Sequence, residues 1–291
     1  MIDPRYGRLL TGVDLDFLHT AVGGPPPEQL RADPTSTEAL LRSPAVYEAL
    51  FGSVDKDPLL QASPFLVFSV LINKVAADLQ HATFVEEWLG PNQTVPVFDV
   101  ASLRQFLDTA WHRAFLAELL ASYTRVASES VWQRTTRGWR RRRYSELDPV
   151  RLTQLLEVVP VAQRPAVCRR VGDLALFLSG VFPEHAATHP LQPRHVERIS
   201  RLLDATAPAA GAPGGSALPD EVMQAGGPQQ GIWLLEWLGR RAYRLAIQAA
   251  GMSAGELREV VKEFGRARRV LNVLTRQYLY PSRQRWFPSA G

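Results

Sequence analysis

The chain has 291 residues, of which 46% are hydrophobic and 21% are charged. These proportions are ordinary for a globular protein, so they exclude a fibrous or largely disordered chain. The 33 basic and 29 acidic side chains give a net charge of +4. The one cysteine, Cys168, excludes an internal disulfide framework and a cysteine-rich zinc module, and we predict that it is a buried apolar side chain.

No targeting segment is predicted. The first residues contain no basic stretch followed by an apolar core, so a secretory signal is not expected. The longest apolar run, residues 65–72, is interrupted by Ser69 and is much shorter than the about 20 residues that a membrane span requires. Together with the low cysteine content, this predicts a cytoplasmic protein.

Positive and negative side chains are unevenly distributed along the chain. Residues 1–124 carry 8 basic and 15 acidic side chains, whereas residues 125–151 carry 8 and 3, and residues 240–285 carry 11 and 3. Thirty of the basic residues are arginine, a bias that a GC-rich genome explains without any function. The two basic blocks are compatible with binding to an anionic partner. They are equally compatible with packing against the acidic half of the same molecule or of a neighbouring molecule.

Turn signals and apolar periods predict an all-α fold, an irregular bundle of about eight helices around a long central apolar helix. Residues 1–34 contain a Gly-Gly-Pro-Pro-Pro run and are predicted to form an irregular leader, followed by a helical core over 35–206. Residues 207–230, rich in Ala, Gly and Pro, are predicted to be a flexible linker or insertion, and residues 231–291 to supply C-terminal helices on the same core. The helices are expected at 36–51, 64–89, 99–128, 149–159, 165–182, 193–205, 232–250 and 253–280.

Cap signals predict where several of these helices begin. Ser63 offers an oxygen to an orphan backbone N–H, and Pro64 at the first helical position loses nothing by lacking one. Asp99 is expected to cap the next helix, and Ser253 with Glu256 three residues later has the pattern of a capping box. The helix from Pro64 is apolar on every side in its first turns, which is why we place it at the centre.

Common catalytic and metal-binding motifs are absent from the sequence, including a phosphate loop, a Gly-x-Gly-x-x-Gly turn and a His-Glu-x-x-His pair. The nearest metal-like set is Glu184, His185, His189 and His195, but prolines interrupt this segment, so we interpret the histidines as structural or exposed. No metal and no cofactor is therefore predicted, and we favour a non-enzymatic protein over an enzyme.

The most distinctive functional candidate is the segment over residues 132–144, which contains Gly138 and no apolar period and is predicted to be a basic loop. Guanidinium groups bind phosphates bidentately, and indole rings stack on exposed bases. The loop is therefore predicted to contact an anionic partner, either nucleic acid or an acidic protein face. The alternative is a solvated or self-docked arginine loop with Trp132 as an anchor. The candidate contact residues are Trp132, Arg134, Arg137, Trp139, Arg140, Arg141, Arg142, Arg143 and Tyr144.

A second basic stripe occurs in the last predicted helix, where Arg258, Lys262 and Arg266 follow one another at steps of four residues. Glu259 and Glu263 lie beside this stripe in the sequence, so we favour an ordinary exposed helix face with neighbouring ion pairs.

Polar residues within apolar helices define a second candidate site. Asp173 lies in an apolar run, where an unpaired charge is costly, so we expect a basic partner for it. The expected partner is Arg169, Arg170 or Lys74, and Lys74 can also reach Asp78 one turn away. We favour structural ion pairs, and the alternative is a polar pocket of an enzyme or ligand sensor. The pocket would lie between the 64–89 and 165–182 helices, with Asn73, Lys74, Asp78, Asp173, Glu236 and Tyr243 as its polar residues.

Three stretches of the chain carry a family resemblance. They are Ser-Pro-Phe-Leu-Val-Phe at 63–68, the Gly-Asp-x-Ala-Leu-Phe-Leu-Ser-Gly-x-Phe-Pro pattern within 170–183, and Leu-Glu-Trp-Leu-Gly through Tyr-Arg at 235–244. Together they resemble an uncharacterised all-helical protein family of actinobacteria over most of residues 60–287. The resemblance implies a bacterial origin and one continuous domain, and it implies no activity, ligand or catalytic residue.

The leading hypothesis is a cytoplasmic, non-enzymatic binding or regulatory protein that contacts an anionic partner through the Arg/Trp-rich segment. One alternative is the enzyme or ligand sensor with a polar pocket. Another is a self-assembling structural subunit, a homo-oligomer held together by its opposed charges.

Overall fold

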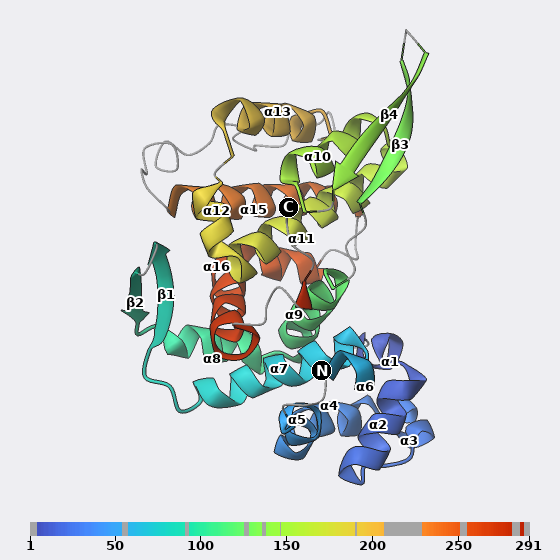
Figure 1. Ribbon diagram of the computed structural model, residues 1–291, viewed down its shortest axis with the longest axis vertical. Coiled ribbons are helices and arrows are strands. Elements are labelled where there is room, and N and C mark those ends of the chain that lie inside the picture. The colour runs from blue at the N-terminus through green and yellow to red at the C-terminus, as the bar shows by residue number, and fades with distance from the viewer. Residues whose placement is uncertain are drawn as a thin grey trace. The chain divides into compact units, whose positions relative to one another are not determined.

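The computed structural model describes residues 5–53, 58–90, 93–124, 128–135, 138–145, 147–189, 191–206, 229–250, 255–280 and 286–287. This part of the chain is all-α in class, as predicted, with fifteen α-helices and two small two-stranded sheets (Figure 1). None of the helices within these residues combines the length and the apolar character needed to cross a bilayer.

The chain divides into two compact units, each built from segments that are distant in sequence. Unit 1 consists of Met1–Glu86, Pro96–Arg125 and Val273–Phe287, and unit 2 of Glu87–Val95, Val126–Asn272 and Pro288–Gly291. The family resemblance implied one continuous domain, and the predicted division into leader, core, linker and C-terminal helices does not follow the boundary between the units. Most of the linker predicted over 207–230 lies outside the described residues, and its last two positions begin a helix.

Proline begins most of the helices, which explains why the described residues contain more helices than the sequence predicted. Proline lacks the N–H that a first helical turn leaves unsatisfied, and its fixed φ suits that position. Pro44 illustrates the effect: the helix predicted over 36–51 is divided there, and Ser43 caps the second part by accepting a hydrogen bond from the backbone N–H of Ala45 at 3.3 Å.

Unit 1 is built around the contact between α7 and α9. α7 is buried along most of its length, from Phe65 to Leu79, in agreement with its apolar sequence. The helices of unit 1 are α1 (Arg5–Leu9), α2 (Gly12–Val22), α3 (Pro27–Ala32), α4 (Pro34–Leu41), α5 (Pro44–Phe51), α6 (Pro58–Gln61), α7 (Pro64–Leu79), α8 (Val100–Asp108) and α9 (Ala110–Ser122), with a π-helical turn at Thr275–Leu279.

The N-terminal residues form helices, so the prediction of an irregular leader is wrong. Thr11 and Asp14 make a capping box at the start of α2: the Thr11 N–H donates to Asp14 Oδ2 at 2.7 Å, and the Asp14 N–H donates to Thr11 Oγ1 at 3.2 Å. Asp14 also accepts from the backbone N–H of Ser63 at 2.7 Å, which ties α2 to the start of α7. The glycine–proline run only separates α2 from α3, with Gly23 in the left-handed conformation at φ 64°.

α7 begins where predicted but ends earlier. Ser63 caps it by accepting from the Leu66 N–H at 3.2 Å. The helix stops at Leu79 and not at residue 89, and Arg104 Nε donates to the Leu79 carbonyl oxygen at 2.7 Å, which satisfies one orphan group of the helix end. Two strands follow instead, β1 (Val85–Gly90) and β2 (Gln93–Val97), and the boundary between the units passes through both.

The helix predicted over 99–128 is also divided, into α8 and α9. Thr109, the single residue between them, has an extended backbone, with φ −80° and ψ 116°. His112 Nδ1 lies 2.7 Å from the Phe106 carbonyl oxygen, and Arg113 Nη1 donates to the Leu107 carbonyl oxygen. These two side chains satisfy carbonyls that the break deprives of helical partners, so they stabilise the interruption.

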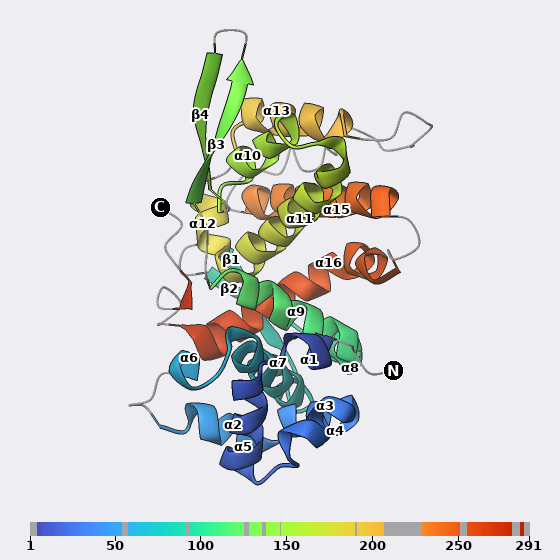
Figure 2. The ribbon, with the colours of Figure 1, turned by 90° about the vertical axis from the view of Figure 1, so that its right-hand side faces the viewer.

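Unit 2 is built around the close packing of α11 against α15, with α12 also on α15 (Figure 2). The helices predicted from residues 165, 193 and 232 are confirmed, with small changes of boundary. The α-helices of unit 2 are α10 (Pro149–Thr153), α11 (Arg164–Val181), α12 (Pro183–Thr188), α13 (Pro193–Asp204), α15 (Gln229–Ala250) and α16 (Gly255–Leu274), whose last residues belong to unit 1. The capping box predicted at Ser253 lies outside the described residues.

The segment predicted to be a basic loop is a β-hairpin, so that prediction is wrong. β3 (Ser128–Thr135) pairs with β4 (Gly138–Ser145) in antiparallel orientation. The far end of this hairpin extends beyond α10 and α13 in both views (Figures 1 and 2).

Candidate functional site

The register of the β3–β4 hairpin divides the predicted contact residues between two faces. Trp132 lies opposite Arg141, and Arg134 lies opposite Trp139. Directly opposed residues of an antiparallel pair share one face, and successive residues of a strand alternate between faces. One face therefore carries Trp132, Arg134, Trp139, Arg141 and Arg143, and we call it the indole–arginine face.

The second face of the hairpin has a different composition. It carries Arg140, Arg142 and Tyr144, and Glu129 lies opposite Tyr144 in the register. Three arginines and both tryptophans thus share the first face, whereas the second has two arginines, a glutamate and no tryptophan. The remaining candidate contact residue, Arg137, lies outside the described residues.

Two of the polar residues predicted in the helix from Pro64, Lys74 and Asp78, form a cluster with Tyr47 and Tyr278 within unit 1. Lys74 Nζ donates to Asp78 Oδ1 at 2.5 Å, as predicted, and lies 5.6 Å from the ring centroid of Tyr47. The hydroxyl of Tyr278 donates to the same carboxylate, and burial, followed by this hydrogen bond, raises the pKa of Tyr278. Asn73 donates to a carbonyl of its own helix at 2.8 Å. The cluster is a paired structural network in which a protonated tyrosine serves as a donor.

The other predicted pocket residues lie in unit 2, so Asp173 and Tyr243 are in a different compact unit from Asn73, Lys74 and Asp78. Tyr243 Oη donates to Asp173 Oδ1 at 2.7 Å, and Arg169 Nε lies 4.0 Å from Asp173 Oδ2. The basic partner expected for Asp173 is confirmed as Arg169, while the hydroxyl donor was not predicted as its partner.

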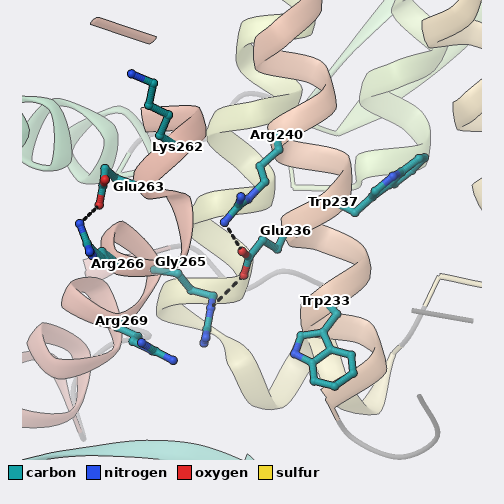
Figure 3. Close-up of a pocket in the computed structure, with 10 residues that line it drawn as sticks. Trp233, Glu236, Trp237, Arg240, Lys262, Glu263, Gly265, Arg266 and Arg269 are labelled. Atoms are coloured by element: carbon teal, nitrogen blue, oxygen red, sulfur yellow. Dashed lines mark hydrogen bonds and ion pairs between the residues drawn. The ribbon is translucent and has the colours of Figure 1, made fainter. Parts of the chain in front are cut away.

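The last predicted pocket residue, Glu236, lies in an open groove of about 680 Å³ between α15 and α16 of unit 2 (Figure 3). Arg240 Nη2 donates to Glu236 Oε1 at 2.6 Å, and Arg268 Nε lies 3.6 Å from Glu236 Oε2. Trp233 contributes an indole that is 41% exposed. We refer to this feature as the basic groove.

The second basic stripe contributes to the basic groove. Lys262 and Arg266 line it from α16, and their ion pairs with Glu259 and Glu263 three residues earlier are of the ordinary helical kind that we favoured. The sequence contains this stripe and also Trp233 and Trp237 four residues apart on α15, but neither pattern shows which helices are neighbours.

The histidines of the metal-like set and the cysteine are placed as follows in the described residues. The rings of His185 and His189 stack with centroids 4.5 Å apart, and burial, followed by the charge of His189, lowers the pKa of His185. Within the described part of the chain, no three His, Cys, Asp or Glu side chains are grouped as metal ligands would be. Cys168 is fully buried, as predicted.

Comparison with known proteins adds no constraint on function. No family model, no curated protein and no solved structure matches the chain.

Proposed function

We propose that the protein binds single-stranded nucleic acid through the indole–arginine face of the β3–β4 hairpin. The observation that supports this function is the register, which assigns Trp132, Trp139 and three arginines to one face. A single strand exposes both a phosphate backbone and unpaired bases, so it is recognised by guanidinium groups together with aromatic rings.

The spacing of the face suits an extended chain of alternating phosphates and bases. Residues two apart in a strand are separated by about 7 Å, so Trp132 and Arg134 occupy successive positions on the same face of β3. Across the ladder Arg141 accompanies Trp132, and Trp139 accompanies Arg134. Each strand thus carries both an arginine for phosphate and a tryptophan for a base. An acidic protein surface has carboxylates but no bases, so it would bind the arginines and leave the tryptophans unused.

The two faces provide matched variants that remove the same charge. Arg141→Ala with Arg143→Ala changes the indole–arginine face, and Arg140→Ala with Arg142→Ala changes the other. Binding of a short fluorescein-labelled oligo(dT) is measured by anisotropy over a salt series. We expect the first pair to weaken binding about tenfold more than the second, and wild-type affinity to fall steeply between about 50 and 200 mM salt.

Two results would contradict the proposal. If both double variants lose the same affinity, binding depends on total charge and not on the face. If the wild type does not bind oligo(dT) at low salt, nucleic acid is not the ligand.

A competition experiment separates nucleic acid from an acidic protein partner. Polyglutamate supplies negative charge without bases, so we expect it to displace oligo(dT) only weakly at equal charge concentration. Trp139→Ala should weaken oligo(dT) binding about tenfold, because base stacking contributes about 1–3 kcal/mol per base, and should leave polyglutamate binding unchanged. Equal competition by polyglutamate would identify an acidic protein face as the partner and overturn the proposal.

A further inference from the structure

The basic groove of unit 2 is lined by side chains from two helices. α15 supplies Trp233, Glu236 and Arg240, and α16 supplies Lys262, Arg266 and Arg269 (Figure 3). Within each helix the members recur at three- and four-residue steps, which place them on one helix face. The volume of about 680 Å³ falls within the range of small-ligand sites.

Positive charge exceeds negative charge around the groove. Glu236 is shared by Arg240 at 2.6 Å and Arg268 at 3.6 Å, and Glu87 is shared by Arg268 at 2.5 Å and Arg269 at 3.1 Å. Three guanidinium groups therefore share two carboxylates, while Arg266 and Lys262 pair with one carboxylate each, Glu263 and Glu259. Because each guanidinium has five N–H donors, these contacts leave donors for an additional anion.

The groove is held in shape by its most buried member. The side chain of Arg268 is 8% exposed and lies between Glu87 and Glu236, so it links β1 to α15 and α16. The side chains of Arg240 and Arg266 are 32% and 37% exposed, which leaves them accessible to a ligand. Arg268 is thus held in place by two ion pairs, while Arg240 and Arg266 at the sides of the groove are accessible to a ligand.

Trp233 and Gly265 determine what shape of ligand the groove accepts. The indole of Trp233 is 41% exposed and offers a flat apolar surface. Gly265 leaves the space beside the ion pair open, since a Cβ at this position would lie 3.5 Å from Glu236 Oε1 and 3.9 Å from Arg240 Nη2. A planar ring and an anionic group therefore have adjacent places in one site.

We propose that the basic groove binds a small phosphorylated ligand with a planar ring, of the mononucleotide class. The ring stacks on Trp233, and the phosphate oxygens accept hydrogen bonds from Arg240 and Arg266. This site goes beyond the function proposed for the β3–β4 hairpin, and it uses none of the hairpin residues.

Calorimetric titration of the full-length protein with ADP, inorganic pyrophosphate and adenosine tests the two parts of the ligand separately. We expect ADP to bind most tightly, pyrophosphate less tightly and adenosine least. Trp233→Ala should weaken ADP binding about tenfold and leave pyrophosphate binding unchanged, because only the ring contact is lost. Arg266→Gln should weaken the binding of both ADP and pyrophosphate.

Gly265→Leu fills the groove without changing its charge, and leucine is a good helix former. We expect this variant to retain its thermal transition and to lose ADP binding at least tenfold, while Gly255→Ala, in open space on the same helix, binds normally. Unchanged ADP affinity in folded Gly265→Leu, or no binding of ADP and pyrophosphate by the wild type, would overturn the proposal. The hairpin variant Arg141→Ala/Arg143→Ala should retain ADP affinity, so failure of one proposal is distinguishable from failure of the other.

Discussion

Tyr243 lies so close to Gly172 that a Cβ on the glycine would come within 2.5 Å of the tyrosine ring. The two residues belong to α11 and α15, the most extensively packed pair of helices in unit 2. Gly239 of α15 is equally close to Phe264, because a Cβ on this glycine would lie 2.6 Å from the phenylalanine ring. Glycine at these positions is therefore required by the close approach of neighbouring side chains.

Gly172→Ala should destabilise unit 2. Alanine favours a helix over glycine by about 1 kcal/mol, but the added methyl group must displace a fully buried aromatic ring. Overpacking of this kind costs about 1–3 kcal/mol, so we expect a net loss in the free energy of unfolding, measured in urea. Gly255→Ala, where no atom lies within 4 Å of the added methyl, is the control and should be neutral. Equal stability of the two variants would contradict the packing argument.

Tyr243→Phe should lower the free energy of unfolding by about 1–2 kcal/mol, since it removes the hydrogen bond to the carboxylate of Asp173 at 2.7 Å. The ring and its packing against Gly172 are retained, so the variant isolates the hydroxyl. Tyr280→Phe is the matched control, because Tyr280 is 65% exposed. Urea unfolding curves that shift equally for the two variants would assign no stabilising role to the Tyr243–Asp173 hydrogen bond.

Glu38→Gln should strongly destabilise unit 1. Glu38 Oε1 accepts from Arg113 Nη2 at 2.5 Å and from Arg42 Nη2 at 2.6 Å, and the Arg113 side chain is only 3% exposed. Removing one partner of a buried ion pair costs about 3–5 kcal/mol, because the remaining charge stays buried. Glu259→Gln removes an exposed pair with Lys262 and should cost about 0–1 kcal/mol. A small difference in thermal stability between these two variants would contradict a structural role for Arg113.

The start of α7 was predictable from the sequence, whereas its end and the break between α8 and α9 were not. Ser63 and Pro64 act locally, and α7 begins there as predicted. The end of α7 and the break before α9 are stabilised by Arg104 and Arg113, which donate to carbonyls 25 and six residues earlier in the chain, contacts that no cap signal at the helix end encodes. The cap predicted at Asp99 also differs, because its carboxylate accepts from the Ser102 hydroxyl at 2.6 Å and makes no hydrogen bond to a backbone N–H of α8.

The hairpin site was predictable in composition but not in geometry, whereas the sequence indicated only part of the basic groove, namely Glu236, Lys262 and Arg266. Arginine occurs on both faces of the β3–β4 hairpin, so the sequence has no alternation of apolar and polar residues to indicate strands. The pairing of Trp132 with Arg141 is likewise a property of the register. In the basic groove, Trp233 and Arg266 are brought together only by the packing of α15 beside α16.

Cys168 should be unreactive in the folded protein and should make stability dependent on pH in the alkaline range. Burial, opposed in part by the charge of Arg164, raises the pKa of its thiol to about 11 from an ordinary value of 9.0. The folded state thus favours the protonated thiol, and the resulting stabilisation is complete below about pH 9 and is lost as the pH rises toward 11. Iodoacetamide at pH 8.5 should label the native protein far more slowly than the urea-unfolded protein, since only the thiolate reacts. The difference in unfolding free energy between wild type and Cys168→Ala should shrink between pH 9 and pH 11, a comparison in which the titration of other groups cancels. Rapid labelling of the native thiol, or a difference that does not change with pH, would show that the Cys168 thiolate is not disfavoured by burial.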